Sequence, residues 1–201
     1  MKALARNTSL AVLAALGVVT LGSFEQPGLS ANIVQFPMVV SPGASTCLPH
    51  AKGQVTITPG GPRDHMHVVV SGLPKITDFD FFVIQVPNAP FGMSWYQGDI
   101  ETDSTGVGAG NFVGRFSIET FVVAPGAAAA PTTEPTDASV NPSTPPIQMY
   151  HLGLWFNDPN AAQKAGCANS VTPFNGEHNA GIQVLNTSNF PDNSGPLLKV
   201  H

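Results

Sequence analysis

The stretch "HMHVVVSGLPKITDFDFFVIQV", residues 65–86, contains two apolar runs on either side of an S-G-L-P turn. The first run is rich in valine and the second in phenylalanine, valine and isoleucine. β-branched and aromatic side chains favour strands, whereas Gly and Pro favour turns. The stretch therefore predicts two strands joined by a turn, and it points to a β fold.

The same pattern continues in both directions from this stretch. Short apolar or alternating runs, bounded by Gly and Pro, predict seven strands at residues 54–58, 65–72, 78–86, 94–103, 111–123, 147–156 and 181–187. One short helix is predicted within 157–166, where Asp158 can cap, Pro159 suits the first turn and Gly166 suits the exit. We therefore expect an all-β protein, an antiparallel β-sandwich of about seven strands with one short helix.

The N-terminus has the features of a secretory signal peptide. Lys2 and Arg6 precede an uncharged apolar run at residues 10–21, which is shorter than the roughly 20 residues of a membrane helix. Small residues follow, and we place the cleavage after Ala31, with a site near Gly22 as the alternative. Residues 1–31 are thus predicted to be a signal peptide, and the mature chain is predicted to be secreted, either extracellular or at the cell surface.

The mature chain, residues 32–201, is long enough for one domain with a substantial core. Residues 124–146 are of low complexity, rich in Ala, Pro, Ser and Thr, and we interpret them as a long loop within that single domain. No later stretch is long and apolar enough for a membrane helix, so we expect no membrane span in the mature chain.

The composition argues against a nucleic-acid partner. Only 10% of the residues are charged, and the formal net charge is −5. Lysine and arginine form no cluster, whereas nucleic-acid binding depends on basic patches that neutralise phosphates. The expected partner is instead an unknown extracellular ligand.

The two cysteines, Cys47 and Cys167, lie near opposite ends of the mature chain. An even number of cysteines in an exported protein predicts a disulfide, with two buried free thiols as the alternative. The C-x-x-C spacing of redox and zinc motifs is absent. We therefore predict one disulfide whose role is structural.

Four histidines are the candidate metal ligands. His65 and His67 are two apart in a predicted strand, so they share a face and their imidazoles can converge on one zinc or copper ion. His151 is predicted to lie on the outer face of its own strand, and His178 in a loop that could reach over. The competing interpretation is that His65 and His67 are polar side chains on the solvated face of a sheet.

Two other groups of side chains are candidates for binding. Exposed Trp95, Tyr96 and Trp155, flanked by polar residues, could stack on sugar rings, although such rings also serve as core residues. Asp99, Glu101 and Asp103 alternate along one strand, which suits either a calcium site or an ordinary solvated edge. The EF-hand pattern does not fit this trio.

The turn "SGLP" (71–74), "GDIETDSTG" (98–106) and "TPFNGEHNAGIQVLNT" (172–187) resemble segments of uncharacterised secreted bacterial β-sandwich proteins. The resemblance covers about half of the mature chain, and it implies a fold and a location but no activity.

The sequence contains no G-x-S-x-G nucleophile motif and no phosphate-binding loop, so we assign no catalytic residue. We expect a non-catalytic extracellular domain, structural or ligand-binding, with a glycan as the candidate ligand and no cofactor. The alternative is a zinc- or copper-binding protein, or a metalloenzyme, with its site centred on His65 and His67.

Overall fold

The computed structural model describes residues 32–122, 147–173 and 178–201, which form an antiparallel β structure. The predicted signal peptide, residues 1–31, and the predicted loop at 124–146 lie outside the described residues. Within the described ranges, no helix is long and apolar enough to cross a lipid bilayer.

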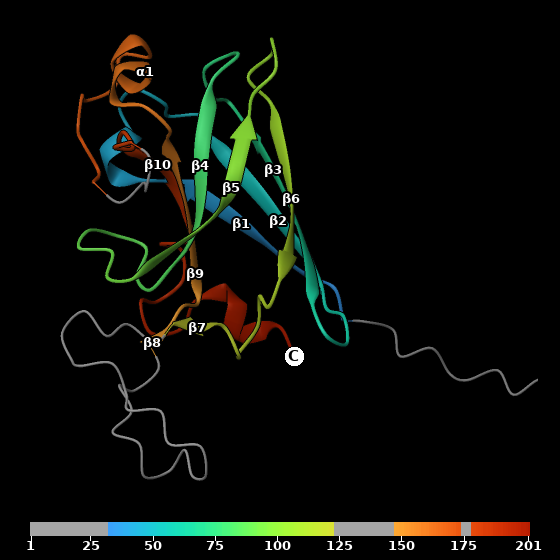
Figure 1. Ribbon diagram of the computed structural model, residues 1–201. Coiled ribbons are helices and arrows are strands. Elements are labelled where there is room, and N and C mark those ends of the chain that lie inside the picture. The colour runs from blue at the N-terminus through green and yellow to red at the C-terminus, as the bar shows by residue number, and fades with distance from the viewer. Residues whose placement is uncertain (1–31, 123–146, 174–177) are drawn as a thin grey trace, which may run out of the picture. The chain divides into compact units, whose positions relative to one another are not determined.

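Eight strands form one continuous hydrogen-bonded order, β5-β4-β9-β10-β1-β2-β3-β6, which curves into a barrel-like arrangement (Figure 1). Their bounds are β1 Val34–Val40, β2 Lys52–Thr58, β3 Asp64–Ser71, β4 Asp78–Ile84, β5 Ser94–Glu101, β6 Gly108–Gly114, β9 His151–Phe156 and β10 Gln183–Asn186. A separate ribbon pairs β7, Phe121–Val122, with β8, Ile147–Gln148. The predicted all-β, antiparallel fold is confirmed.

Strand β1 joins the two halves of the barrel. Its first five residues pair with β2, and Val39 and Val40 pair with β10. The sequence prediction missed this strand, because Pro37 interrupts an apolar segment of only seven residues, and Pro weakens a strand assignment. The prediction of one continuous strand at 111–123 was also wrong, since β6 ends at Gly114 and the chain turns before β7.

The inward-facing side chains of both halves form the main core. Strand β3 shows the alternation clearly, because Met66, Val68 and Val70 are buried while His65 and His67 are exposed. A second cluster of buried residues lies on the opposite face of β4 and β9 and consists of Phe82, Ile84, Trp155 and Ala180, with Phe91 packed against it. The β4–β9 part of the sheet is therefore covered on both faces.

The predicted helix and disulfide are both present. Helix α1, Pro159–Lys164, begins after Asp158, whose carboxylate accepts a hydrogen bond from the Asn160 backbone N–H at 2.8 Å. Gly166 follows with φ of +80°, the left-handed conformation that favours glycine after a helix. The sulfurs of Cys47 and Cys167 are bonded, which ties the segment after the 3₁₀ helix η1, Pro42–Ala44, to the end of α1.

Candidate functional site: a cleft between the terminal strands

Strands β5 and β6 stand at the two ends of the strand order, and no hydrogen-bonded ladder joins them. Near the connecting hairpin they approach closely, with a single bridge between Thr102 and Gly108. A Cβ at Gly108 would lie 2.7 Å from the Glu101 carbonyl oxygen, so this approach requires glycine. Toward their other ends the two strands separate (Figure 1). The barrel wall is open there.

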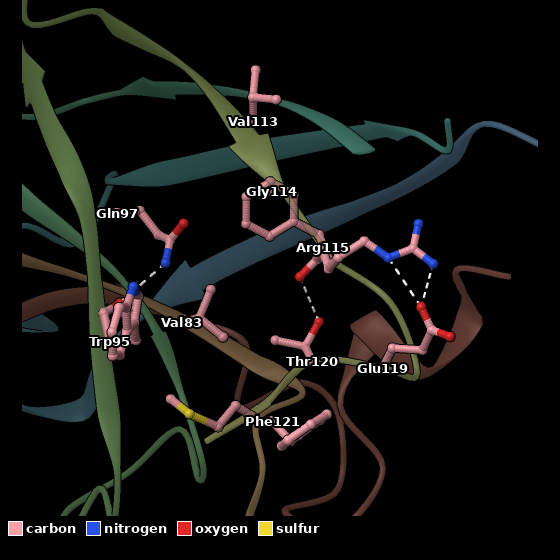
Figure 2. Close-up of a pocket in the computed structure, with 11 residues that line it drawn as sticks. Val83, Trp95, Gln97, Val113, Gly114, Arg115, Glu119, Thr120 and Phe121 are labelled. Atoms are coloured by element: carbon pink, nitrogen blue, oxygen red, sulfur yellow. Dashed lines mark hydrogen bonds and ion pairs between the residues drawn. The ribbon is translucent and has the colours of Figure 1, made fainter. Parts of the chain in front are cut away.

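A cleft of about 320 Å³ occupies this opening (Figure 2). Its floor is formed by the buried core side chains Val83, Phe116 and Met149. Its walls include two aromatic side chains, Trp95 and Phe121, which are 61% and 52% exposed. The volume is within the range of small-molecule sites, ~300–1,000 Å³.

Strand pairing explains why Trp95 is so exposed. Trp95 pairs with Val83, whose side chain belongs to the main core, so Trp95 also points to the inner face of the barrel. The opposite wall has separated at this level, and the described residues leave most of the indole exposed. Tyr96 has the opposite orientation, because it pairs with Phe82 of the outer cluster, and it is 49% exposed.

A β-bulge next to Trp95 introduces Gln97 at the cleft. The register of β4 and β5 shifts between Phe81 and Phe82, so Gln97 is the extra residue of β5. Bulges commonly change the direction of a side chain at a binding site. The Gln97 amide donates to the Trp95 carbonyl oxygen at 3.4 Å and lies above the indole in Figure 2. It therefore provides polar groups at the rim beside an exposed aromatic ring.

The other side of the rim contains an ion pair. The Arg115 Nε donates to Glu119 at 3.0 Å, and this partner raises the pKa of the guanidinium above its ordinary value. The Thr120 hydroxyl donates to the Arg115 carbonyl oxygen at 2.7 Å, which fixes the turn that holds both charged residues. Figure 2 shows Arg115 and Glu119 on the side opposite Trp95 and Gln97, with the guanidinium pointing away from those two residues toward Glu119. The arrangement provides stacking surfaces and hydrogen-bonding groups, as a binding site requires.

The structure does not bring the four predicted metal ligands together. His65 and His67 lie on the exposed face of β3, where the His67 Nδ1 donates to the Asn111 side-chain oxygen at 2.8 Å. His151 is on β9, separated from β3 by three strands in the sheet order. His178 bonds to the Asn157 side chain. Across residues 32–122, 147–173 and 178–201, no group of three or more His, Cys, Asp or Glu side chains is arranged to hold a metal ion.

His151 and Trp155 lie on the outer face of β9, as predicted, but both side chains are buried there. Leu152 and Leu154 point into the main core, and Trp155 points to the opposite face. That face is covered. Phe91 packs edge-to-face on Trp155 with ring centroids 5.0 Å apart, and both His151 ring nitrogens bond to later residues of the chain. Trp155 is fully buried, and of the three predicted stacking residues only Trp95 lines the cleft.

The acidic residues of β5 face acidic residues of β4 rather than solvent alone. Asp78 is paired with Glu101, and Asp80 with Asp99. Burial and then the charge of Asp99 raise the pKa of Asp78 above its ordinary value. Asp103 lies beyond β5, where its carboxylate accepts hydrogen bonds within the turn at Thr105 and Val107. The three acidic residues considered as calcium ligands are thus divided between a strand face and a turn.

Comparisons with known proteins do not identify this chain: no protein-family model matches its sequence, and no curated protein matches it.

Proposed function

We propose that this protein is a secreted, non-catalytic domain that binds a glycan in the β5–β6 cleft. The observation that carries the proposal is the exposed indole of Trp95, which points to the inner face of an open barrel wall. An indole face packs well against the apolar face of a sugar ring. Gln97, Glu119 and Thr120 provide acceptors and donors within the same cleft for sugar hydroxyls.

The location is supported by two features. The N-terminal sequence has the pattern of a signal peptide. The Cys47–Cys167 disulfide is compatible with an oxidising compartment, since such bonds persist mainly outside the cytosol. Direct evidence would come from N-terminal sequencing of the protein recovered from the culture medium. A chain beginning at Asn32 is the expected result.

The binding proposal is tested with a glycan panel, followed by titration of any glycan that binds. The chain has two tryptophans, and Trp155 is buried, so a ligand in the cleft should alter the fluorescence of Trp95. We expect Trp95→Ala to weaken binding by at least about tenfold, as expected for a central aromatic contact. The measurement is the dissociation constant from fluorescence and calorimetric titration.

Tyr96→Ala is the matched control for this experiment. Tyr96 is the next residue along the chain and is also exposed, but its side chain lies on the other face of β5. The Tyr96→Ala variant should therefore bind the glycan as tightly as the wild type does. The proposal is wrong if no glycan binds, or if Trp95→Ala and Tyr96→Ala reduce binding equally.

A further inference from the structure

A second cavity, of about 410 Å³, lies away from the β5–β6 cleft, on the outer side of β9 and β10. Three separate segments border it: the start of η1, the loop after β4 and the segment after α1. We call it the Ser41 cavity, and the lining residues used below are Ser41, Asn88, Phe91, Trp155 and Gln183. Among the described residues that line it, none has an ionisable side chain.

Ser41 provides a hydroxyl group that borders the cavity and is not enclosed by protein atoms. The residue is only 5% exposed, and its backbone is fixed by a bond from its N–H to the Val184 carbonyl oxygen at 2.8 Å. Although Ser41 precedes η1, its side chain makes no capping bond, and its hydroxyl makes no hydrogen bond to any described residue. This hydroxyl can therefore both donate to and accept from a ligand in the cavity.

Asn88 provides a second oriented group. Asn186 donates from its side-chain amide to the Gln183 side-chain oxygen at 2.9 Å and to the Asn88 side-chain oxygen at 3.3 Å. Because Asn88 uses its oxygen in this network, its NH₂ group is left as a donor. Gln183 itself donates to the Pro87 carbonyl oxygen at 3.0 Å, which fixes the start of the loop that carries Asn88.

Phe91 forms an apolar wall of the cavity. It is partly buried, and Trp155 supports it from below in an edge-to-face contact. The described lining thus combines an aromatic ring with a hydroxyl and an amide, and these described residues bring no charge to it. An ion entering such a site would lose hydration without a counter-charge, so the site favours a neutral ligand.

We propose that the Ser41 cavity binds one saccharide ring. A sugar ring is neutral, has hydroxyls that match Ser41 and Asn88, and has an apolar C–H face that can pack on Phe91. This inference deepens the proposed function by adding a second, separate subsite, and it rests on that proposal for the class of ligand. The two sites predict different sets of affected residues, so one can fail while the other holds.

The experiment is an amide-resolved NMR titration of the full mature chain. The probes are methyl glycosides of glucose, galactose and mannose, and N-acetylglucosamine, each in millimolar excess. Binding in the Ser41 cavity should shift the amide signals of Gly43, Ala89, Phe91 and Thr172. Binding in the β5–β6 cleft should instead shift Trp95, including its indole N–H, and Gln97. A parallel titration with oligosaccharides shows whether the cavity binds a free monosaccharide or the terminal sugar of a glycan.

Two variants test the contacts. Ser41→Ala removes the hydroxyl and should weaken binding up to about tenfold, the value of one neutral hydrogen bond. Asn88→Asp keeps the oxygen that accepts from Asn186 but replaces the donor by a charge, and it should abolish binding; it also provides the test if Ser41→Ala fails to fold. Ser45→Ala, whose hydroxyl bonds to the Pro42 carbonyl oxygen, is the control and should bind normally.

The inference is overturned if no probe shifts the cavity signals, if shifts occur only around Trp95, or if folded Ser41→Ala and Asn88→Asp bind as the wild type does. Shifts confined to the cleft would leave the proposed function intact, whereas shifts confined to the cavity would move the glycan site away from Trp95.

Discussion

His151 is a titratable side chain that the fold encloses. Its Nδ1 accepts from the Thr187 hydroxyl at 2.9 Å, and its Nε2 donates to the carbonyl oxygens of Pro191 and Asp192 at 3.2 and 3.1 Å. Burial lowers the pKa of His151 below its ordinary value of 6.5. The imidazole therefore joins the start of β9 to two later segments of the chain, in its neutral form.

This environment makes stability depend on pH. The unfolded chain takes up a proton at His151 near pH 6.5, whereas the folded chain does so only at lower pH. The stabilising contribution is therefore complete above pH 6.5 and is lost as the pH falls through the folded-state pKa. We expect the free energy of unfolding, measured by urea titration, to decline on acidification below pH 6.5.

The variant His151→Phe keeps the ring but cannot titrate or form hydrogen bonds. It should be less stable at neutral pH by about 1–3 kcal/mol, because Thr187 and two carbonyl groups lose their partner. In this variant the free energy of unfolding should also decline less on acidification than it does in the wild type. His50→Gln, at an exposed position, is the control. Parallel pH profiles for wild type and His151→Phe would contradict the assignment.

Asp78 and Asp103 should respond to neutralisation in opposite directions. The pKa of Asp78 is raised by burial and by Asp99, so its charge opposes folding at neutral pH. The pKa of Asp103 is lowered, chiefly by its hydrogen bonds with Thr105, so its charge supports folding. Asp78→Asn should therefore raise the midpoint of thermal unfolding at pH 7, and Asp103→Asn should lower it.

The pH dependence of this pair provides a further check. The destabilising charge of Asp78 forms as the pH rises through its folded-state pKa, and the gain from Asp78→Asn should therefore shrink on acidification. The decrease in the unfolding midpoint caused by Asp103→Asn should also become smaller on acidification. Below the ordinary pKa of Asp103 its carboxyl group is protonated in the unfolded chain, so the stabilising effect of its charge is lost as the pH falls further. If both substitutions change the unfolding midpoint in the same direction at pH 7, hydrogen bonding rather than charge determines the effect at one of the two positions.

At the scale of elements, the disulfide connects the segment after η1 to the end of α1. Cys47 and Cys167 are 120 residues apart, and a crosslink that closes so long a loop reduces the entropy of the unfolded chain. The chain-entropy description gives up to about 4–5 kcal/mol for such a loop. The bond is therefore expected to be a major contribution to the stability of this domain.

The double variant Cys47→Ala, Cys167→Ala should lower the free energy of unfolding by about 2–5 kcal/mol. The β barrel should remain, because its strands pair independently of the sulfurs, and circular dichroism should retain its β signal. A reducing agent should have the same effect on the wild type and none on the variant. If the two proteins unfold at the same urea concentration, the crosslink is not stabilising.

Elements with strong local signals were the predictable ones. Helix α1 has Asp158 before it, Pro159 at its start and Gly166 after it, and its predicted position was confirmed. Strand β1 has no such signals. Pro37 has no backbone N–H to donate to the ladder, and the pairing of β1 with β2 and β10 compensates for this loss. An element was predictable where local residue preferences determine its structure, and it was not predictable where tertiary pairing does.

At the scale of the molecule, the strand order determines which predicted residues meet. Alternation correctly assigned Trp95 and Tyr96 to opposite faces and His65 and His67 to one face. Alternation carries no information about which strands are neighbours or which loops cover a face. For that reason, neither the cleft beside Trp95 nor the covering of Trp155 by Phe91 was predictable from the sequence.

The strand order also bears on the metal hypothesis. His65 and His67 share a face, but His151 is buried on a strand that β10, β1 and β2 separate from them. Two imidazoles alone bind zinc weakly, because a stable protein site usually has three or four ligands. We expect elemental analysis of tag-free protein to show less than one equivalent of zinc or copper.

A stoichiometric metal that is lost in the double variant His65→Ala, His67→Ala would contradict this expectation and restore the metal hypothesis. His50→Ala serves as the control for a general effect of removing an imidazole.

The position of β1 has a consequence for biosynthesis. Strand β1 is hydrogen-bonded to β10, whose residues 183–186 are made after those of every other described strand. Until they emerge from the ribosome, β1 and β9 each present an unpaired edge, and such edges attract other chains. Premature termination anywhere before residue 183 should therefore yield products that aggregate. Chaperone protection during synthesis should matter more for this protein than for one whose strands pair only with their neighbours in sequence.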